Sequence, residues 1–185
     1  MKQFTKSLGQ VFLNDQNIIK KIINFASPSP KIRIIEIGCG KGILSSELSK
    51  ISSDLHIIEI DNRWATYVQN LQLPNTTMHC QDALKFNFNQ FNSKSSIIAN
   101  IPYQITTPLI EHFVQHKHKL SKCTIMIQKE VADRILANSN SKTYGLLTIF
   151  CNYHFEIEKG FNVSRNCFFP SPKVDSHVLS FTPKK

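Results

Sequence analysis

Four consecutive residues, Asn100-Ile101-Pro102-Tyr103, place an amide, an apolar spacer, a proline and an aromatic ring directly after an apolar run. The amide oxygen can accept a hydrogen bond, and the tyrosine ring can stack on a flat molecule. Because Pro102 restricts its own φ and keeps Ile101 extended, a main-chain carbonyl of this pair would be held in a set direction. The four residues predict either an ordinary strand-ending turn or a pocket for a flat, hydrogen-bonding substrate.

A glycine-rich stretch, Glu36-Ile-Gly38-Cys-Gly40-Lys-Gly42, follows an earlier apolar run. Glycines permit a tight turn and a close approach of a ligand to the backbone. A helix that starts here would point its N-terminal amides at an anionic group. The GxGxG spacing differs from the GxGxxG of dinucleotide-binding folds. By itself the stretch is equally compatible with a structural turn and with a ligand-binding loop.

Two carboxylates end the next two apolar segments of the chain. Glu59, 21 residues after Gly38, is placed to accept hydrogen bonds from both hydroxyls of a ribose. Asp82 is placed to accept one from an adenine amino group. Taken singly, Glu59 could form a surface salt bridge and Asp82 could cap a helix or turn. Their occurrence at successive strand ends, after a glycine loop, favours a ligand that contains a nucleoside.

The elements that must position these residues follow from the apolar pattern. Apolar runs predict strands at 32–37, 55–60, 76–80, 95–100, 123–128, 144–155 and 176–182, the last as an antiparallel edge strand. Helices are predicted within 13–26, 38–50, 61–72, 106–117 and 129–138. Strands alternating with helices predict an α/β fold with a doubly wound, mostly parallel seven-stranded sheet. Ligands of such sheets bind at the carboxyl ends of the strands.

The composition narrows the class of protein. The 185 residues, 41% of them apolar, suit one α/β domain over 1–185. An excess of 22 Lys and Arg over 13 Asp and Glu, a net charge of +9, favours nucleic acid or a membrane surface as partner. A basic but indifferent surface is the alternative. Five cysteines without a CxxC pair, and no apolar segment long enough to span a membrane, predict a cytoplasmic, soluble protein without a zinc site.

The motifs at the strand ends together resemble those of the S-adenosylmethionine-dependent methyltransferases, which have a Rossmann-like fold. The Asn-Ile-Pro-Tyr stretch resembles the signature of members that act on exocyclic amino groups. Four further stretches, KSLGQVFL (6–13), MIQKEVADRI (126–135), SKTYGLL (141–147) and FFPSPKVDS (168–176), resemble the ribosomal small-subunit RNA adenine dimethyltransferases of the KsgA type. This resemblance implies methylation, by S-adenosylmethionine, of the N6 amino groups of two adjacent adenines near the 3′ end of 16S rRNA during ribosome biogenesis.

The resemblance also implies roles for individual residues at the cofactor. Gly38 would face S-adenosylmethionine, Leu13 would line its pocket, Glu59 would bind the ribose, Asp82 would bind the adenine, and Asn100 would touch both cofactor and target base. The family usually has asparagine where this chain has Val11, so one amide contact to the cofactor would be lost. It usually has proline where this chain has Cys39, which is either a reactive thiol or a buried small residue.

The target amine is a poor nucleophile because its lone pair is delocalised into the adenine ring. The Asn100 side chain and one of the two following main-chain carbonyls could accept hydrogen bonds from the amine and favour a pyramidal nitrogen. Tyr103 would stack on one face of the base. The resemblance assigns the other face to Phe168, with core packing of Phe168 and stacking by the neighbouring Phe169 as alternatives.

The RNA would be held mainly through its phosphates. The candidate cations are Lys2, Lys6, the stretch HKHKLSK (116–122), Lys129, Arg134, Lys142, Arg165 and Lys173, with a solvated helix end as the alternative for 116–122. We expect a monomer, without metal or membrane, that acts on small-subunit rRNA in an assembling particle, and we expect the family's C-terminal helical domain to be absent. The alternative functions are a large-subunit rRNA adenine methyltransferase of the macrolide-resistance type and a non-enzymatic RNA-binding factor of ribosome assembly.

Overall fold

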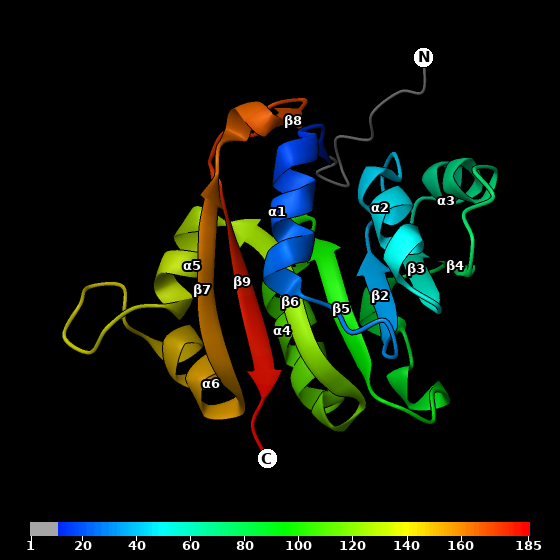
Figure 1. The fold of residues 1–185 in the computed structure, drawn as a ribbon. Coiled ribbons are helices and arrows are strands. Elements are labelled where there is room, and N and C mark those ends of the chain that lie inside the picture. The colour runs from blue at the N-terminus through cyan, green and yellow to red at the C-terminus, as the bar shows by residue number, and fades with distance from the viewer. Residues whose placement is uncertain (1–10) are drawn as a thin grey trace.

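The computed structural model describes residues 11–185, so the candidate cations Lys2 and Lys6 lie outside the described residues (Figure 1). One sheet has the strand order β4-β3-β2-β5-β6-β9-β7. Its strands are β2 (Arg33–Ile37), β3 (Leu55–Glu59), β4 (Thr76–Cys80), β5 (Ser95–Asn100), β6 (Leu120–Gln128), β7 (Phe155–Val163) and β9 (Ser176–Pro183). A second, small sheet pairs β1 (Phe12–Leu13) with β8 (Phe168–Phe169). The predicted α/β fold with a mostly parallel seven-stranded sheet is confirmed.

Helices cover both faces of the large sheet (Figure 1). They are α1 (Gln16–Ala26), α2 (Ile43–Ile51), α3 (Asn62–Gln69), α4 (Thr106–Gln115), α5 (Lys129–Ile135) and α6 (Leu146–His154). The helices α1 to α3 enclose one core cluster with the sheet, and α4 to α6 enclose the other. Neighbouring strand residues point to opposite faces, so Ile34 enters one cluster and Ile35 the other. This explains why the parallel strands are apolar without alternation.

The prediction of a strand at 144–155 is wrong. Residues Leu146–His154 form α6, which begins after Gly145, and the strand β7 follows it at Phe155–Val163. An apolar run alone cannot distinguish a buried strand from a buried helix. Two contacts hold this helix in place. The Thr148 hydroxyl donates to the Arg134 carbonyl of α5 at 2.6 Å, and the Cys151 side chain is buried in the core.

The prediction that 176–182 forms an edge strand is also wrong, although its antiparallel direction is confirmed. The strand β9 lies between β6 and β7 and pairs antiparallel with both. Its first residue, Ser176, is opposite Gln128, the last residue of β6. An antiparallel strand in a parallel sheet therefore brings its beginning to the edge where the other strands end.

Candidate active site

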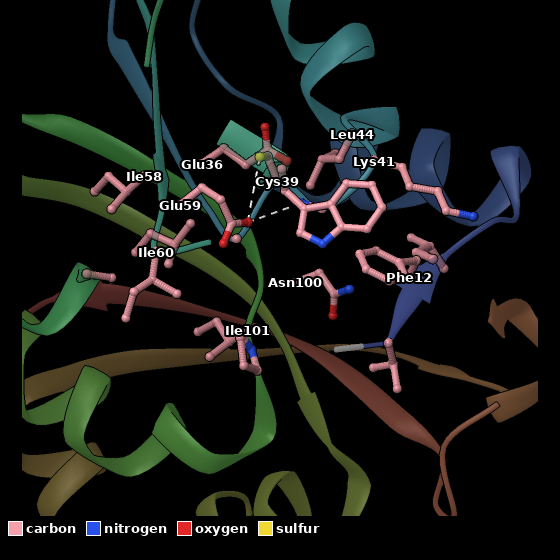
Figure 2. Close-up of a pocket in the computed structure, with 18 of the residues that line it drawn as sticks. Phe12, Glu36, Cys39, Lys41, Leu44, Ile58, Glu59, Ile60, Asn100 and Ile101 are labelled. Atoms are coloured by element: carbon pink, nitrogen blue, oxygen red, sulfur yellow. Dashed lines mark hydrogen bonds between the residues drawn. The ribbon is translucent and has the colours of Figure 1, made fainter. Parts of the chain in front are cut away.

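A cavity of about 200 Å³ opens at the carboxyl ends of β2, β3 and β5, and it is shown in Figure 2. Every residue expected at the cofactor contributes to its lining: Val11, Leu13, Gly38, Cys39, Glu59, Asp82 and Asn100. The cavity therefore unites residues from the glycine loop and from three separate strand ends. This is the location expected for a ligand of a doubly wound sheet.

The glycine loop between β2 and α2 needs its glycines for two physical reasons. Gly38 and Gly40 have φ of +76° and +49°, a region that other residues seldom adopt. A Cβ on Gly38 would lie 3.4 Å from the Asn100 carbonyl oxygen, and a Cβ on Gly40 would lie only 2.5 Å from the Phe12 ring. The loop thus packs directly against the strand end of β5 and against β1, and it forms the floor of the cavity.

Glu59 ends β3 at the cavity wall and is only 8% exposed. One carboxylate oxygen accepts a hydrogen bond from the Asp61 N–H at 2.9 Å, and the other accepts one from the Gly40 N–H at 3.3 Å. Burial nevertheless raises the pKa of Glu59 above its usual value. These two donors fix the direction of the carboxylate and tie β3 to the glycine loop, while its two oxygens keep lone pairs for a ligand.

Glu36 is a cavity residue to which the sequence reasoning assigned no role. It lies in β2, lines the cavity and is 1% exposed, and its Oε2 has no hydrogen-bond partner among residues 11–185. Burial, opposed by the neighbouring Ser45 hydroxyl and reinforced by the charge of Glu59, raises the pKa of Glu36 to about 8. The available signal was its position two residues before Gly38, at the end of a buried strand.

The stretch Asn100 to Tyr103 turns sharply at the rim of the cavity. Asn100 ends β5, and the Ile101 N–H donates to the Met126 carbonyl at 3.2 Å, which anchors the turn on β6. The Pro102 carbonyl accepts from the Ile105 N–H at 3.1 Å, within the 3-10 turn η4 (Tyr103–Ile105). Asn100, Ile101 and Pro102 line the cavity.

Tyr103 is the first residue of η4 and is partly buried, and it is not among the described residues that line the cavity. Its hydroxyl shares a hydrogen bond of 2.9 Å with the Ser176 hydroxyl at the beginning of β9. Burial raises the pKa of Tyr103, so the phenol is neutral at physiological pH. A neutral, restrained ring is suited to stacking rather than to proton transfer.

The two phenylalanines of β8 differ in exposure. Phe168 is 4% exposed and packs in the core cluster that contains Leu13 and Met126, whereas Phe169 is 52% exposed. The structure therefore agrees with the alternative in which Phe168 packs in the core. Stacking by Phe168 on a base stays a prediction that would require this side chain to leave the core.

Asp82 and Cys39, the remaining expected residues, line the cavity and also have a structural role. Asp82 caps the 3-10 turn η2 (Ala83–Lys85) by accepting from the Leu84 N–H at 2.9 Å, and it also lines the cavity. Cys39 is buried, and its thiol lies 3.7 Å from Glu59 Oε2. Burial, reinforced by the charges of Glu36 and Glu59, raises the pKa of the Cys39 thiol far above its usual range. Cys39 is thus a buried small residue and not a reactive thiol.

The candidate cations fall into groups at different places on the sheet. Lys129 directly follows β6, and Arg165 and Lys173 lie in the segment between the end of β7 and the beginning of β9. These three residues are therefore at the edge of the sheet where the cavity opens. The stretch 116–122 precedes and begins β6 instead. It therefore lies at the opposite edge, about 30 Å away along a strand of nine residues. There the Lys119 ammonium donates at 2.9 Å to the carbonyl of Phe91, which follows the 3-10 turn at Phe88–Gln90. Arg134 and Lys142 lie on α5 and in the loop before α6.

Within residues 11–185, no helix is long and apolar enough to cross a membrane. The same part of the chain contains no group of three or more His, Cys, Asp or Glu residues arranged to hold a metal ion.

Known proteins of one family are similar to this chain in sequence. The model of the family described as ribosomal RNA adenine dimethylase matches residues 1–185. Ribosomal RNA small subunit methyltransferase A of Thermotoga maritima is 40% identical over 181 residues, which are 97% of this chain and 63% of that protein.

Solved structures show the same similarity. A dimethyladenosine transferase from Plasmodium falciparum matches with a TM-score of 0.86 at 34% identity, over 94% of this chain and 63% of that one. The 23S rRNA methyltransferase ErmE matches with a TM-score of 0.84 at 26% identity, over 94% of this chain and 70% of that one. The chain thus spans 63 to 70% of the length of these three proteins.

Proposed function

Because this chain belongs to the ribosomal RNA adenine dimethylase family, we propose that it methylates the N6 amino groups of two adjacent adenines near the 3′ end of small-subunit rRNA. S-adenosylmethionine is the methyl donor, and the substrate is an assembling small-subunit particle. The observation that carries the proposal is that Asn100, at the head of Asn-Ile-Pro-Tyr, lines the same cavity as Glu59 and Asp82. One cavity thus holds acceptors for a nucleoside cofactor and an acceptor for a substrate amine.

The cavity residues fit S-adenosylmethionine in shape and charge. The side-chain-free backbone at Gly38 leaves room for close approach, and Glu59 is aligned to accept from two ribose hydroxyls. Asp82 has one carboxylate oxygen beyond the turn it caps, which can accept from an adenine amino group. The unpartnered Oε2 of Glu36 leaves a buried carboxyl atom available to hydrogen-bond with the cofactor. The cofactor supplies, when bound, an electrophilic methyl group on its sulfonium sulfur.

The residues around Asn100 activate the amine without a strong base. The Asn100 side-chain oxygen and the Ile101 carbonyl accept the two amino hydrogens, because the Pro102 carbonyl already accepts from Ile105. These bonds favour a pyramidal nitrogen whose lone pair points at the methyl group. Holding amine and methyl in line supplies much of the remaining acceleration. Tyr103 stacks on a base that has left its own stack.

The test uses immature small-subunit particles that lack dimethyladenine, incubated with the protein and isotopically labelled cofactor. We expect mass spectrometry of the digested rRNA to find labelled dimethyladenine at two adjacent positions. Asn100→Ala should lower the rate by about 100-fold or more. Asn92→Ala, a change of an exposed residue, should leave it unaltered. No labelled dimethyladenine with the wild-type protein would refute the proposal.

Two alternatives are tested when the same assay is extended to large-subunit RNA and to particle maturation. Structural similarity to ErmE supports a large-subunit rRNA adenine methyltransferase as the second candidate. Labelled adenine in large-subunit RNA, and none in small-subunit particles, would establish that candidate. A non-enzymatic assembly factor would promote particle maturation equally well with Asn100→Ala and with the wild-type protein.

A further inference from the structure

The ring of Tyr103 is held by a residue that lies 73 positions further along the chain. Its hydroxyl and the Ser176 hydroxyl are 2.9 Å apart. Ser176 is fully buried, with 0% exposure, while Tyr103 is only partly buried. The tyrosine hydroxyl is therefore tied to the inside of the protein, while Tyr103 lies in the chain between Pro102 and Gln104, which both line the cavity.

The anchoring hydroxyl is fixed more firmly than the tyrosine itself. Ser176 pairs with Gln128 of β6 and with Val163 of β7, so its backbone is restrained on both sides of β9. The preceding residue, Asp175, accepts from the Lys129 N–H and from the Arg165 N–H, each at 2.9 Å. Tyr103, in contrast, begins the short 3-10 turn η4.

A single hydrogen bond limits where this ring can lie. The tyrosine hydroxyl oxygen lies on the axis of the Cβ–Cγ bond, so its restraint fixes the direction of that axis and limits rotation about the Cα–Cβ bond. Stacking on a base requires the ring at a defined position, because offset stacking fails when the ring swings away from the base. Burial raises the pKa of Tyr103, so the phenol keeps its proton and does not act as a base toward the amine. Its contribution therefore comes from this geometry.

We propose that Ser176 is a positioning residue that holds the ring of Tyr103 in the position needed to stack on the target base. The proposal rests on the proposed rRNA adenine methylation. It adds a residue of β9 to the base-binding machinery, although Ser176 itself touches neither base nor cofactor. The antiparallel β9 makes this possible, because only a strand that begins at the cavity edge can place its first side chain behind η4.

The same strand provides a matched control. Ser180 is also fully buried in β9, and its hydroxyl pairs with the Thr124 hydroxyl at 2.5 Å. It lies four residues further along β9, away from the cavity edge. Ser176→Ala and Ser180→Ala each remove one buried hydroxyl pair from one strand, so they should alter stability alike. Only Ser176→Ala removes the restraint on Tyr103.

The experiment measures methylation of immature small-subunit particles by the full chain carrying Ser176→Ala, Tyr103→Phe, both changes, or Ser180→Ala. We expect either change in the pair to lower kcat/KM by about fivefold, the factor for one neutral hydrogen bond. The double variant should lose no more than either single variant. Ser180→Ala should keep the wild-type value. Equal losses in Ser176→Ala and Ser180→Ala, or fully additive losses in the double variant, would overturn the proposal.

A spectroscopic readout separates positioning from stability. An RNA carrying 2-aminopurine at the target position should be quenched by stacking on Tyr103 in the wild-type complex and be brighter with Ser176→Ala. Cofactor affinity, followed through Trp64 in the cavity wall, should be the same in all variants. Equal quenching in the wild type and in Ser176→Ala would overturn the proposal. A wild-type protein without methylation would instead refute the proposed function.

Discussion

The buried carboxyl of Glu36 makes the stability of this protein depend on pH in a direction that is unusual for an acidic residue. Its pKa is raised from 4.5 to about 8, chiefly by burial. A raised pKa means that the folded state holds the proton more tightly than the unfolded state does. Stability from this group is therefore fully present below pH 4.5 and is lost as the pH rises toward 8.

The size of the effect follows from the shift. Each unit of pKa difference corresponds to about 1.4 kcal/mol once the group would be ionised in the unfolded chain. Between pH 5 and pH 8 the folded protein should thus lose about 3 kcal/mol through Glu36. Glu36→Gln keeps the shape of the protonated side chain but removes the titration. Glu36→Gln should therefore differ little from the wild type at pH 5 and be more stable by about 3 kcal/mol at pH 8.

Urea unfolding at the two pH values measures this difference, with the single tryptophan, Trp64, as a buried fluorescent probe. Glu111→Gln, at an exposed site on α4, is the control for removal of a carboxylate. The decisive quantity is the difference in free energy of unfolding between Glu36→Gln and the wild type, compared at the two pH values. An equal difference at pH 5 and pH 8 would mean that Glu36 titrates in the folded protein as it does in the unfolded chain.

Three further changes test other parts of the structure. Val11→Asn should tighten S-adenosylmethionine binding about fivefold in a Trp64 fluorescence titration, by adding an amide at the cavity wall; unchanged affinity would mean that this side chain does not contact the cofactor. Gly40→Ala should lower the free energy of unfolding by about 1–3 kcal/mol, because its Cβ would lie 2.5 Å from the Phe12 ring at a φ of +49°; a wild-type urea midpoint would contradict this. Burial lowers the pKa of His56 and His79 from 6.5, so the free energy of unfolding should fall as the pH drops below 6.5. This fall should be smaller in the double variant His56→Gln and His79→Gln, and thermal unfolding that is equally acid-sensitive in both proteins would argue against this reasoning.

The parallel part of the fold could be predicted from local patterns. Strands predicted at 76–80 and 95–100 coincide with β4 and β5, because short β-branched runs between turn residues have few other structures available. The segment 144–155 could not be predicted in this way, because a long apolar run fits a buried helix equally well. A better signal lay just beyond it, where Phe155, Ile157, Phe161 and Val163 recur at odd positions along β7.

The cavity-lining positions of Gly38, Glu59 and Asp82 could also be predicted from sequence. These residues come at the ends of successive strands, and the ends of parallel strands meet at one edge. The positions of the two aromatic residues of β8 could not be predicted in this way. Phe168 and Phe169 are adjacent and chemically identical, and only burial in the cluster that contains Leu13 and Met126 makes the first of them a core residue.

The sequence by itself determined which chemical groups this protein places at its strand ends, because each motif is local and needs only its own strand and turn. The tertiary structure decided what each group experiences there. Glu36 has a raised pKa because burial removes water from a carboxyl beside Glu59. Tyr103 acquires a partner because β9 enters the sheet antiparallel between β6 and β7 and begins at the cavity edge. Desolvation and the direction of a distant strand are properties of the assembled chain, so no stretch of residues carries them alone.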